Sequence, residues 1–315
     1  MLARLQKLLV LALLTGSTAW AVILTRLGHP GWGAGAALLI LLGYALFLGL
    51  EFSALYVVQQ PGPAPRARVG QLLRAWWGEV VTAPRVFFWR QPFRSRAEPD
   101  HLPDQNHGAR GVVLVHGFVC NRGLWNPWMR ELRRRNTPHI AINLEPLFDS
   151  IDRYPPLIEA AVARLESITG APVVLVGHSM GGLAIRAWLR QFQADARVHR
   201  VITIGSPHQG TWLARYGHTV NGKEMRQRGP WLTALAAAEP ATRSTRFTCF
   251  YGHCDNIVFP AAAGTLPGAE NLHVPGAAHV QMAFQPVVFN EVCRWLSSPP
   301  ASVPTESGDL ETAAR

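Results

Sequence analysis

The sequence predicts an α/β fold, in which helices flank a mostly parallel, doubly wound sheet and a transmembrane helical hairpin precedes it. Three observations support this prediction. Residues 1–60 contain two long runs without charged residues. From Arg110 onward, short aliphatic runs alternate with stretches of helical pattern, as in βαβ units. One of these runs leads directly into Gly177-His178-Ser179-Met180-Gly181, which places a serine at a strand-to-helix junction.

The N-terminal runs have the length and composition of membrane spans. Residues 8–25 are uncharged, and Glu51 is the one charged residue within 27–58. Each run approaches the roughly 20 residues that cross the hydrocarbon core of a bilayer. The stretch at 26–33 is rich in glycine and can form a loop. We therefore predict a transmembrane hairpin over residues 1–60.

The residues around the two apolar runs indicate whether the first run is cleaved and how the hairpin is oriented in the membrane. A cleaved signal peptide is the alternative for the first run, because Arg4 and Lys7 precede it and residues 19–21 (Ala-Trp-Ala) resemble a cleavage site. We expect Glu51 to lie near a membrane interface or to face the partner helix. The loop holds only Arg26, so we expect both termini and the α/β domain on the cytoplasmic side of a bacterial inner membrane.

Residues 61–109 are predicted to form a linker and a basic, aromatic juxtamembrane segment. The proline-rich start cannot continue a helix. Seven arginines from Arg66 to Arg96 face Glu79 as the one acidic residue, with tryptophan and phenylalanine between them. This composition suits lipid headgroups, and packing against the following domain is the alternative. Because the net charge of +10 is densest here, we expect a membrane partner and no nucleic acid.

Residues 110–297 are predicted to form the α/β domain. With 315 residues, 48% of them hydrophobic, the chain can bury a sizeable core. Aliphatic runs without polar alternation are typical of parallel strands that are buried on both faces. They lie at residues 111–116, 140–144, 173–176 and 201–204, and the helical stretches lie at 126–136, 156–169 and 180–193. Residues 298–315 have the composition of a disordered tail.

Ser179 is the candidate nucleophile. Between a strand and a helix it would occupy a tight, strained turn that exposes its hydroxyl. Gly177 and Gly181 are needed because side chains at these positions would collide with the neighbouring strand and helix. The hydroxyl would also lie at a helix N-terminus, whose dipole favours developing negative charge.

A nucleophilic serine of this kind needs an acid later in the chain. Asp255 is the only aspartate between Asp195 and Asp309, and it follows a predicted strand at residues 246–251. This is where the acid of a catalytic triad belongs. Glu270 is the alternative acid.

The catalytic base must also come from the C-terminal part of the chain, where only His273 and His279 follow Asp255. His273 falls inside an apolar run and is expected to be structural. His279 follows Pro275-Gly276-Ala277-Ala278, a loop from which it can reach the carboxyl ends of the strands. We therefore predict a triad of Ser179, His279 and Asp255.

The developing oxyanion needs preorganised donors, usually two backbone N–H groups. Met180, directly after the nucleophile, is expected to supply one. Phe118, in the loop after the strand at residues 111–116, is expected to supply the other. His116 precedes Gly117 in this loop and is expected to shape the loop rather than to act as a base.

Five motifs occur in the order expected of one family. They are His116-Gly117-Phe118, Gly177-His178-Ser179-Met180-Gly181-Gly182, Gly205-Ser206-Pro207-His208-Gln209-Gly210-Thr211, Asp255-Asn256-Ile257-Val258-Phe259-Pro260 and Gly276-Ala277-Ala278-His279. Over residues 110–297 the chain thus resembles bacterial lipases and esterases of the α/β-hydrolase superfamily. The resemblance implies that fold, ester hydrolysis, and the triad and oxyanion donors named above. Residues 212–245 are short for a large lid and contain no aspartate for the calcium site of some bacterial lipases.

The function expected from these features is hydrolysis of carboxylic esters through an acyl-enzyme on Ser179. The hairpin and the apolar region around Trp212, Trp231 and Leu232 favour lipid or hydrophobic acyl esters. An acyltransferase with the same triad is one alternative, and a non-catalytic membrane scaffold is another, although every triad position is filled.

We expect no cofactor and no metal. The four cysteines lack the spacing of a zinc site. They are expected to be buried or unpaired thiols, with a Cys249–Cys254 bridge as the alternative in an oxidising compartment.

Overall fold

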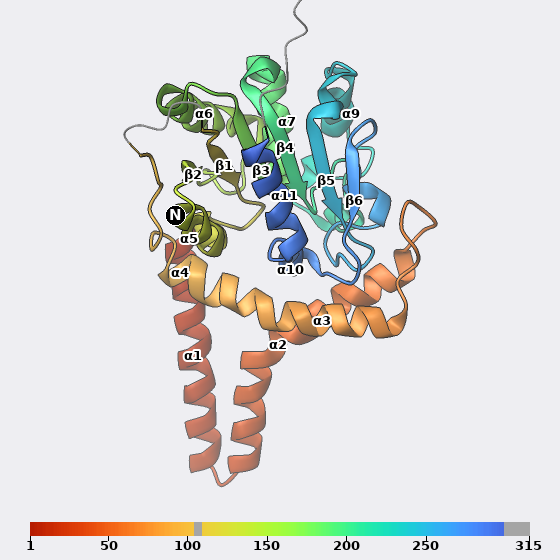
Figure 1. Cartoon of the computed structure of the whole chain (residues 1–315). Coiled ribbons are helices and arrows are strands. Elements are labelled where there is room, and N and C mark those ends of the chain that lie inside the picture. The colour runs from red at the N-terminus through yellow and green to blue at the C-terminus, as the bar shows by residue number, and fades with distance from the viewer. Residues whose placement is uncertain (104–108, 299–315) are drawn as a thin grey trace, which may run out of the picture.

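A six-stranded parallel sheet forms the centre of the computed structural model, which describes residues 1–103 and 109–298 (Figure 1). Its strand order is β2-β1-β3-β4-β5-β6, and every neighbouring pair is parallel. The strands are β1 Val112–Val115, β2 His139–Ala141, β3 Val173–His178, β4 Val198–Ile204, β5 Phe247–Tyr251 and β6 Glu270–His273. The predicted α/β architecture is confirmed. We refer to residues 110–298 as the sheet domain.

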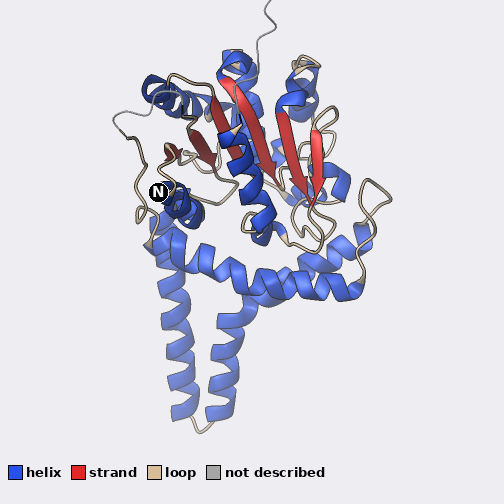
Figure 2. Ribbon diagram, viewed as in Figure 1, coloured by secondary structure: helices blue, strands red, loops and turns tan. Residues whose placement is uncertain are grey.

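Helices cover both faces of the sheet, and their bounds agree with the predicted stretches to within two residues where predictions exist. They are α5 Asn126–Arg134, α6 Pro155–Thr169, α7 Met180–Phe192, α8 Val220–Glu224, α9 Pro230–Ala237, α10 His279–Met282 and α11 Pro286–Ser297. The arrowheads of β4, β5 and β6 point toward the side of the sheet on which the N-terminal helices lie (Figure 2). Apart from Ser298, the predicted tail at 298–315 lies outside the described residues.

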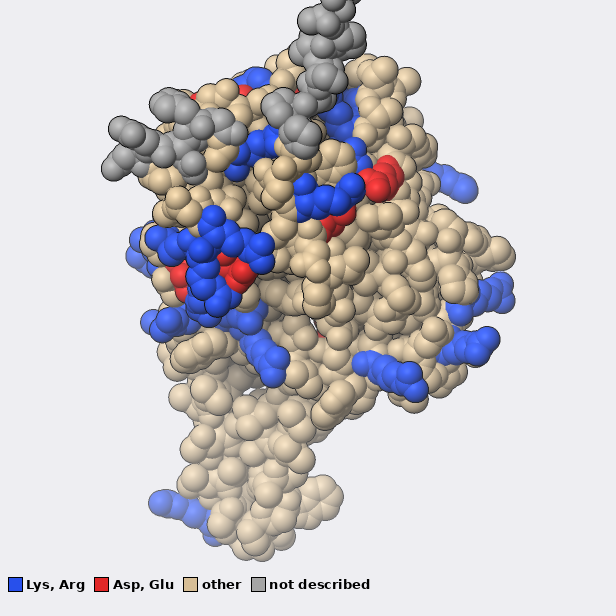
Figure 3. All heavy atoms as spheres, viewed as in Figure 1, with Lys and Arg blue, Asp and Glu red and all other residues tan. Residues whose placement is uncertain are grey.

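Two long helices, α1 Leu2–Arg26 and α2 Pro30–Val58, pack together and project from the sheet domain as a hairpin. Gly33 allows close approach, because a Cβ there would lie 2.8 Å from the carbonyl oxygen of Ala21. The visible face of the projecting hairpin carries no acidic or basic atoms except a basic group near its tip (Figure 3). Both helices are long and apolar enough to cross a membrane, and little of either apolar stretch is buried.

A bent helical segment connects the hairpin to the sheet domain. It comprises α3 Val69–Pro84, a π-helical stretch η1 Arg85–Arg90 and α4 Gln91–Phe93. One face of α3, which includes Leu72, Ala75, Glu79 and Ala83, is buried. Leu73, Trp77 and Val81 form an exposed stripe at a spacing of four residues. The segment therefore packs against the sheet domain, which was the alternative to a position among lipid headgroups, and its outer face is apolar.

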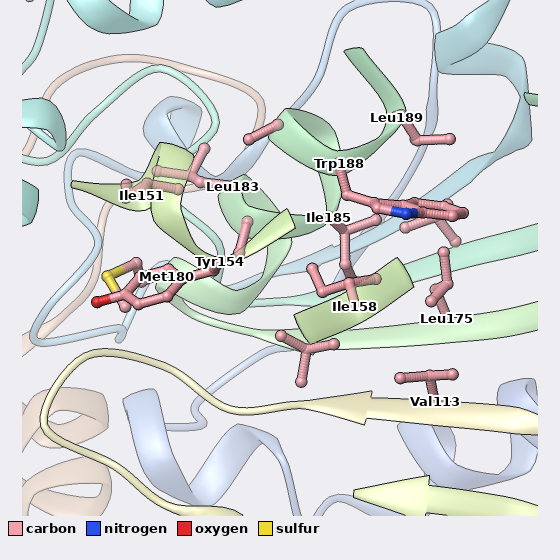
Figure 4. Close-up of a cluster of buried hydrophobic side chains, with 14 of the residues drawn as sticks. Val113, Ile151, Tyr154, Ile158, Leu175, Met180, Leu183, Ile185, Trp188 and Leu189 are labelled. Carbon is pink, nitrogen blue, oxygen red and sulfur yellow. The ribbon is translucent and has the colours of Figure 1, made fainter. Parts of the chain in front are cut away.

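Side-chain alternation along the strands divides the core into two layers, as expected for strands buried on both faces. Val113 and Leu175 pack against α6 and α7, where Ile158, Leu183 and Trp188 converge (Figure 4). On the opposite face, alternate strand residues pack against side chains of α5, α11 and η1. Both faces of the sheet are thereby covered, and its carboxyl edge remains for the site.

Candidate active site

Ser179 occupies the turn between β3 and α7 with φ 55° and ψ −128°, a backbone conformation that is strained for a residue with a side chain. The neighbouring glycines are sterically required. A Cβ on Gly177 would lie 2.7 Å from the backbone nitrogen of Gly182, and one on Gly181 would lie 2.4 Å from the carbonyl oxygen of Val115. The sequence thus forces the serine onto a sharp corner at the carboxyl end of the central strand.

Asp255 and His279 meet beside this corner. The Nδ1 atom of His279 lies 2.9 Å and 3.0 Å from the two carboxylate oxygens of Asp255. Oδ1 of the same carboxylate also accepts hydrogen bonds from the backbone N–H groups of Ile257 and Val258, at 2.9 Å and 2.8 Å. These bonds fix the carboxylate, and the carboxylate orients the imidazole. Because Nδ1 is engaged, Nε2 is the ring nitrogen that is available to a substrate or a nucleophile.

The electrostatic surroundings of His279 favour its protonated form. Burial alone would lower its pKa, but the charge and hydrogen bond of Asp255, with the carboxyls of Glu79 and Glu51, raise the pKa above its ordinary value. His178 lies against the same ring at a centroid distance of 4.7 Å. Burial, followed by the positive charge of His279, lowers the pKa of His178 to about 3, so His178 is neutral.

The loop after β1 brings Phe118 to the nucleophile. Gly117 permits this approach, because a Cβ there would lie 2.7 Å from Cβ of Ser179. Val119 has φ 52°, which is unusual for a β-branched residue and indicates local strain. Met180 is the first residue of α7, so its N–H belongs to the unsatisfied first turn of the helix. Of the two predicted oxyanion donors, Met180 thus follows Ser179 directly and Phe118 lines the same cavity.

His116, Glu270 and His273, which we did not choose as catalytic base or acid, have other partners in the structure. His116 Nδ1 donates to the carbonyl of Gly117 at 2.9 Å, and the N–H of Leu144 donates to His116 Nε2 at 3.0 Å. Burial lowers the pKa of His116 to about 4, so it braces the loop as a neutral ring. Glu270, at the start of β6, forms an ion pair with Arg200. His273 bonds to His253 at 2.7 Å.

Two carboxyl groups from the N-terminal helices contact the candidate site, and the sequence did not predict either contact. Glu79 of α3 accepts hydrogen bonds from the backbone N–H groups of Val280 (2.9 Å) and Gln281 (3.0 Å), the residues that follow His279. It therefore caps the short helix that carries the imidazole. Burial raises the pKa of Glu79 to about 7, despite these hydrogen bonds. The one sequence signal was its isolation as a single acid among arginines.

Glu51 makes a parallel contact from α2. Its Oε2 accepts from the side-chain amide of Asn256 at 2.6 Å, and Asn256 Oδ1 accepts from the N–H of His279 at 3.2 Å. We expected this carboxyl group near a membrane interface or facing the first helix. It contacts the sheet domain instead of the first helix, and its position near a membrane interface stays a prediction. Both N-terminal elements therefore contact the loops that position Asp255 and His279.

A cavity of about 550 Å³ opens at Ser179 and His279. Its polar lining residues include Glu51, Glu79 and Asn256, and most of the others are apolar side chains of α2, η1 and the loop after β1. Trp212, Trp231 and Leu232 are not among its lining residues. Trp212 stacks on Phe259, Trp231 donates to Asp152, and Leu232 is buried in the core, so the apolar character of the site has a different source from the one expected.

The four cysteines are free, and three of them are buried, so Cys249 and Cys254 do not form the alternative bridge. Within residues 1–103 and 109–298, no group of three or more His, Cys, Asp or Glu side chains is arranged to hold a metal ion.

The parallel sheet, the strained serine after β3 and the hydrogen-bonded histidine and aspartate define a hydrolase-type fold. Residues 112–304 match the Alpha/beta hydrolase family, and the chain belongs to that family. A search among curated proteins gave no match.

Solved structures that resemble this chain include lipases. The mature form of the Bacillus licheniformis lipase BlEst2 is 18% identical, with a TM-score of 0.55, over 62% of this chain and 96% of that lipase. Aspergillus fumigatus lipase B is 16% identical, with a TM-score of 0.52, over 77% of this chain and 63% of that one. At these identities the similarity establishes the shared fold.

Proposed function

We propose that the protein is a membrane-anchored serine hydrolase that cleaves carboxylic esters with lipid or hydrophobic acyl groups. The observation that carries the proposal is that Ser179 and His279 line one largely apolar cavity, and that Asp255 is bonded to Nδ1 of the same imidazole. Nothing in this geometry requires a cofactor.

In the proposed reaction, Ser179 Oγ attacks the ester carbonyl and His279 Nε2 takes its proton. Asp255 stabilises the resulting imidazolium. The N–H groups of Phe118 and Met180 stabilise the oxyanion. The imidazolium protonates the departing alkoxide, and the alcohol leaves an acyl-enzyme on Ser179. His279 then accepts a proton from water as the water attacks the acyl-enzyme carbonyl. The imidazolium returns this proton to Ser179 Oγ as the serine–acyl bond breaks and the carboxylic acid leaves.

Membrane anchorage is the second part of the proposal. At about 1.5 Å per residue, the 25 residues of α1 extend about 37 Å, which exceeds the roughly 30 Å of a hydrocarbon core. The N-terminal end of α1 lies beside α4 on the sheet-domain side. There Gln6 donates to Gln91 at 2.6 Å, and Lys7 lies over the ring of Phe93. Both ends of the hairpin therefore lie on one side of the proposed membrane. The exposed stripe of Leu73, Trp77 and Val81 suits the adjoining headgroup layer.

The proposal is tested with purified full-length protein in detergent micelles. We expect a fluorophosphonate probe to label the wild type, and p-nitrophenyl esters of medium and long chains to be hydrolysed. Ser179→Ala should abolish both signals. Thr15→Ala, which removes an exposed hydroxyl on α1, serves as the matched control and should retain them. Full ester hydrolysis by Ser179→Ala would contradict the assignment.

A further inference from the structure

One wall of the cavity at Ser179 belongs to the N-terminal hairpin. Tyr44, Phe47 and Leu48 of α2 line the same space as Ser179 and His279. Phe47 is 62% exposed, whereas Leu48 is partly buried. A single helix thus contributes side chains both to the catalytic cavity and to the apolar outer surface of the hairpin.

We infer that this wall is the binding site for the acyl chain of a bilayer lipid, which enters sideways from the hydrocarbon layer between α2 and η1. The hairpin is then part of the substrate site as well as an anchor. This inference rests on the proposed function, because it needs Ser179 as the nucleophile.

The lining of the cavity has the polarity of such a substrate. Phe87 and Phe88 of η1 join the α2 side chains to form the apolar part. The hydroxyl of Tyr44 is satisfied within the protein, since it donates to the carbonyl of Val80 at 2.9 Å, and its ring packs edge-on against Phe88. Tyr44 therefore presents apolar surface to the cavity.

The polar lining groups adjoin the loop and helix that carry His279. Asn256 is bonded to Glu51, and Glu79 is bonded to backbone N–H groups. An ester fits this division, with its carbonyl between Ser179 and His279 and its hydrocarbon chain along α2. The volume of about 550 Å³ lies within the range of about 300–1,000 Å³ that is typical of small-molecule sites.

The surroundings of α2 favour a lipid over a soluble ester. Leu46 and Leu50, which flank the lining residues, are 62% and 69% exposed. Along the proposed membrane span, these side chains contact lipid tails. An acyl chain can therefore pass from the bilayer to the cavity without crossing water, and the hydrophobic effect does not oppose its transfer.

Leu48→Trp tests the inference, because the larger side chain fills the apolar part of the cavity. The full-length protein in nanodiscs is assayed with p-nitrophenyl esters from acetate to palmitate. We expect kcat/KM for palmitate to fall about tenfold or more, since a blocked pocket discriminates by chain length, and kcat/KM for acetate to change less than about twofold. Leu50→Trp makes the same substitution at a lipid-facing position of the same helix and should leave the profile unchanged.

A covalent probe locates the chain even if Leu48→Trp does not fold. A long-chain alkyl fluorophosphonate with a terminal diazirine is attached to Ser179 of the wild type and irradiated, and mass spectrometry identifies the crosslinked peptide. Crosslinks to residues 44–48 or 87–88 support the inference. Crosslinks confined to residues 205–240, or equal losses on acetate and palmitate in folded Leu48→Trp, overturn it. An absence of any Ser179-dependent labelling or hydrolysis would instead refute the proposed function.

Discussion

Glu79→Gln gives a sharp test of how the N-terminal helices support the catalytic loop. In the wild type, two carboxylate oxygens accept from the N–H groups of Val280 and Gln281, directly after His279. A glutamine keeps one acceptor oxygen and places an NH₂ group opposite the second N–H. The variant therefore resembles the protonated carboxyl and lacks the charge of the ionised form.

The expected magnitude follows from this loss. A hydrogen bond to a charged group contributes about 1.5–3 kcal/mol, so the loss of one such bond, partly offset by relaxation of the loop, should lower kcat/KM by about tenfold. The effect should depend on pH because the pKa of Glu79 is about 7. Wild type and variant should converge below about pH 6, where Glu79 is protonated, and diverge above about pH 8, where it is ionised.

Glu79→Gln should increase the stability of the fold at pH 8, although it lowers kcat/KM. A raised pKa in the folded state means that the protonated carboxyl favours folding. This contribution is complete below the ordinary value of 4.5 and is lost as the pH rises through about 7. The shift corresponds to about 3 kcal/mol for this buried group. Glu79→Gln should therefore raise the melting temperature at pH 8 while it lowers the rate.

The assay is kcat/KM for a medium-chain p-nitrophenyl ester from pH 5.5 to pH 9, with melting temperatures of the same samples. The control is Glu98→Gln, which removes a partly buried carboxylate that pairs with the exposed Arg130 and should match the wild type throughout. A rate ratio of wild type to variant that stays constant across the pH range would refute the positioning role. So would equal rates at pH 8.

Three further predictions concern the hydrolase site. Asp255→Asn should reduce kcat by about a thousandfold or more, because the imidazolium loses its partner and the tautomer is no longer fixed; a rate within tenfold of the wild type would exclude Asp255 as the triad acid. The acid limb of the wild-type pH–rate profile should have its midpoint above 6.5, because the pKa of His279 is raised and the base must be neutral; a midpoint below 6 would argue against this base. Gly181→Ala should prevent accumulation of folded protein in size-exclusion chromatography, because its Cβ would lie 2.4 Å from a backbone oxygen, whereas Gly35→Ala, which meets no atom within 4 Å, should behave as the wild type.

The sequence allowed the sheet domain to be predicted because its signals are local. Buried parallel strands require unbroken apolar runs, and the strained turn at Ser179 requires glycines at fixed positions. Asp255 and His279 could also be selected by elimination, because few aspartates and histidines occur in the C-terminal part of the chain, where the acid and the base are expected. Trp212 shows where local reasoning failed. An aromatic residue in the region expected for a lid suggested a substrate pocket, but its ring stacks on Phe259 in the core.

The contribution of the N-terminal helices could not be predicted for a physical reason. Glu51 and Asn256 are 205 residues apart in sequence, and Glu79 and Val280 are 201 apart, so no periodicity or spacing reports their contact. A membrane span is recognised in a sequence by its apolar composition. That composition gives the length of the span, but it does not show which face of the helix meets a neighbouring domain. Glu79, which is buried, and Glu51, which is partly buried, nevertheless carry information, because an acid removed from water is costly unless a partner satisfies it. Here the partners are the backbone and amide groups that hold His279, so the cost of burying these carboxyls is linked to the geometry of the proposed base.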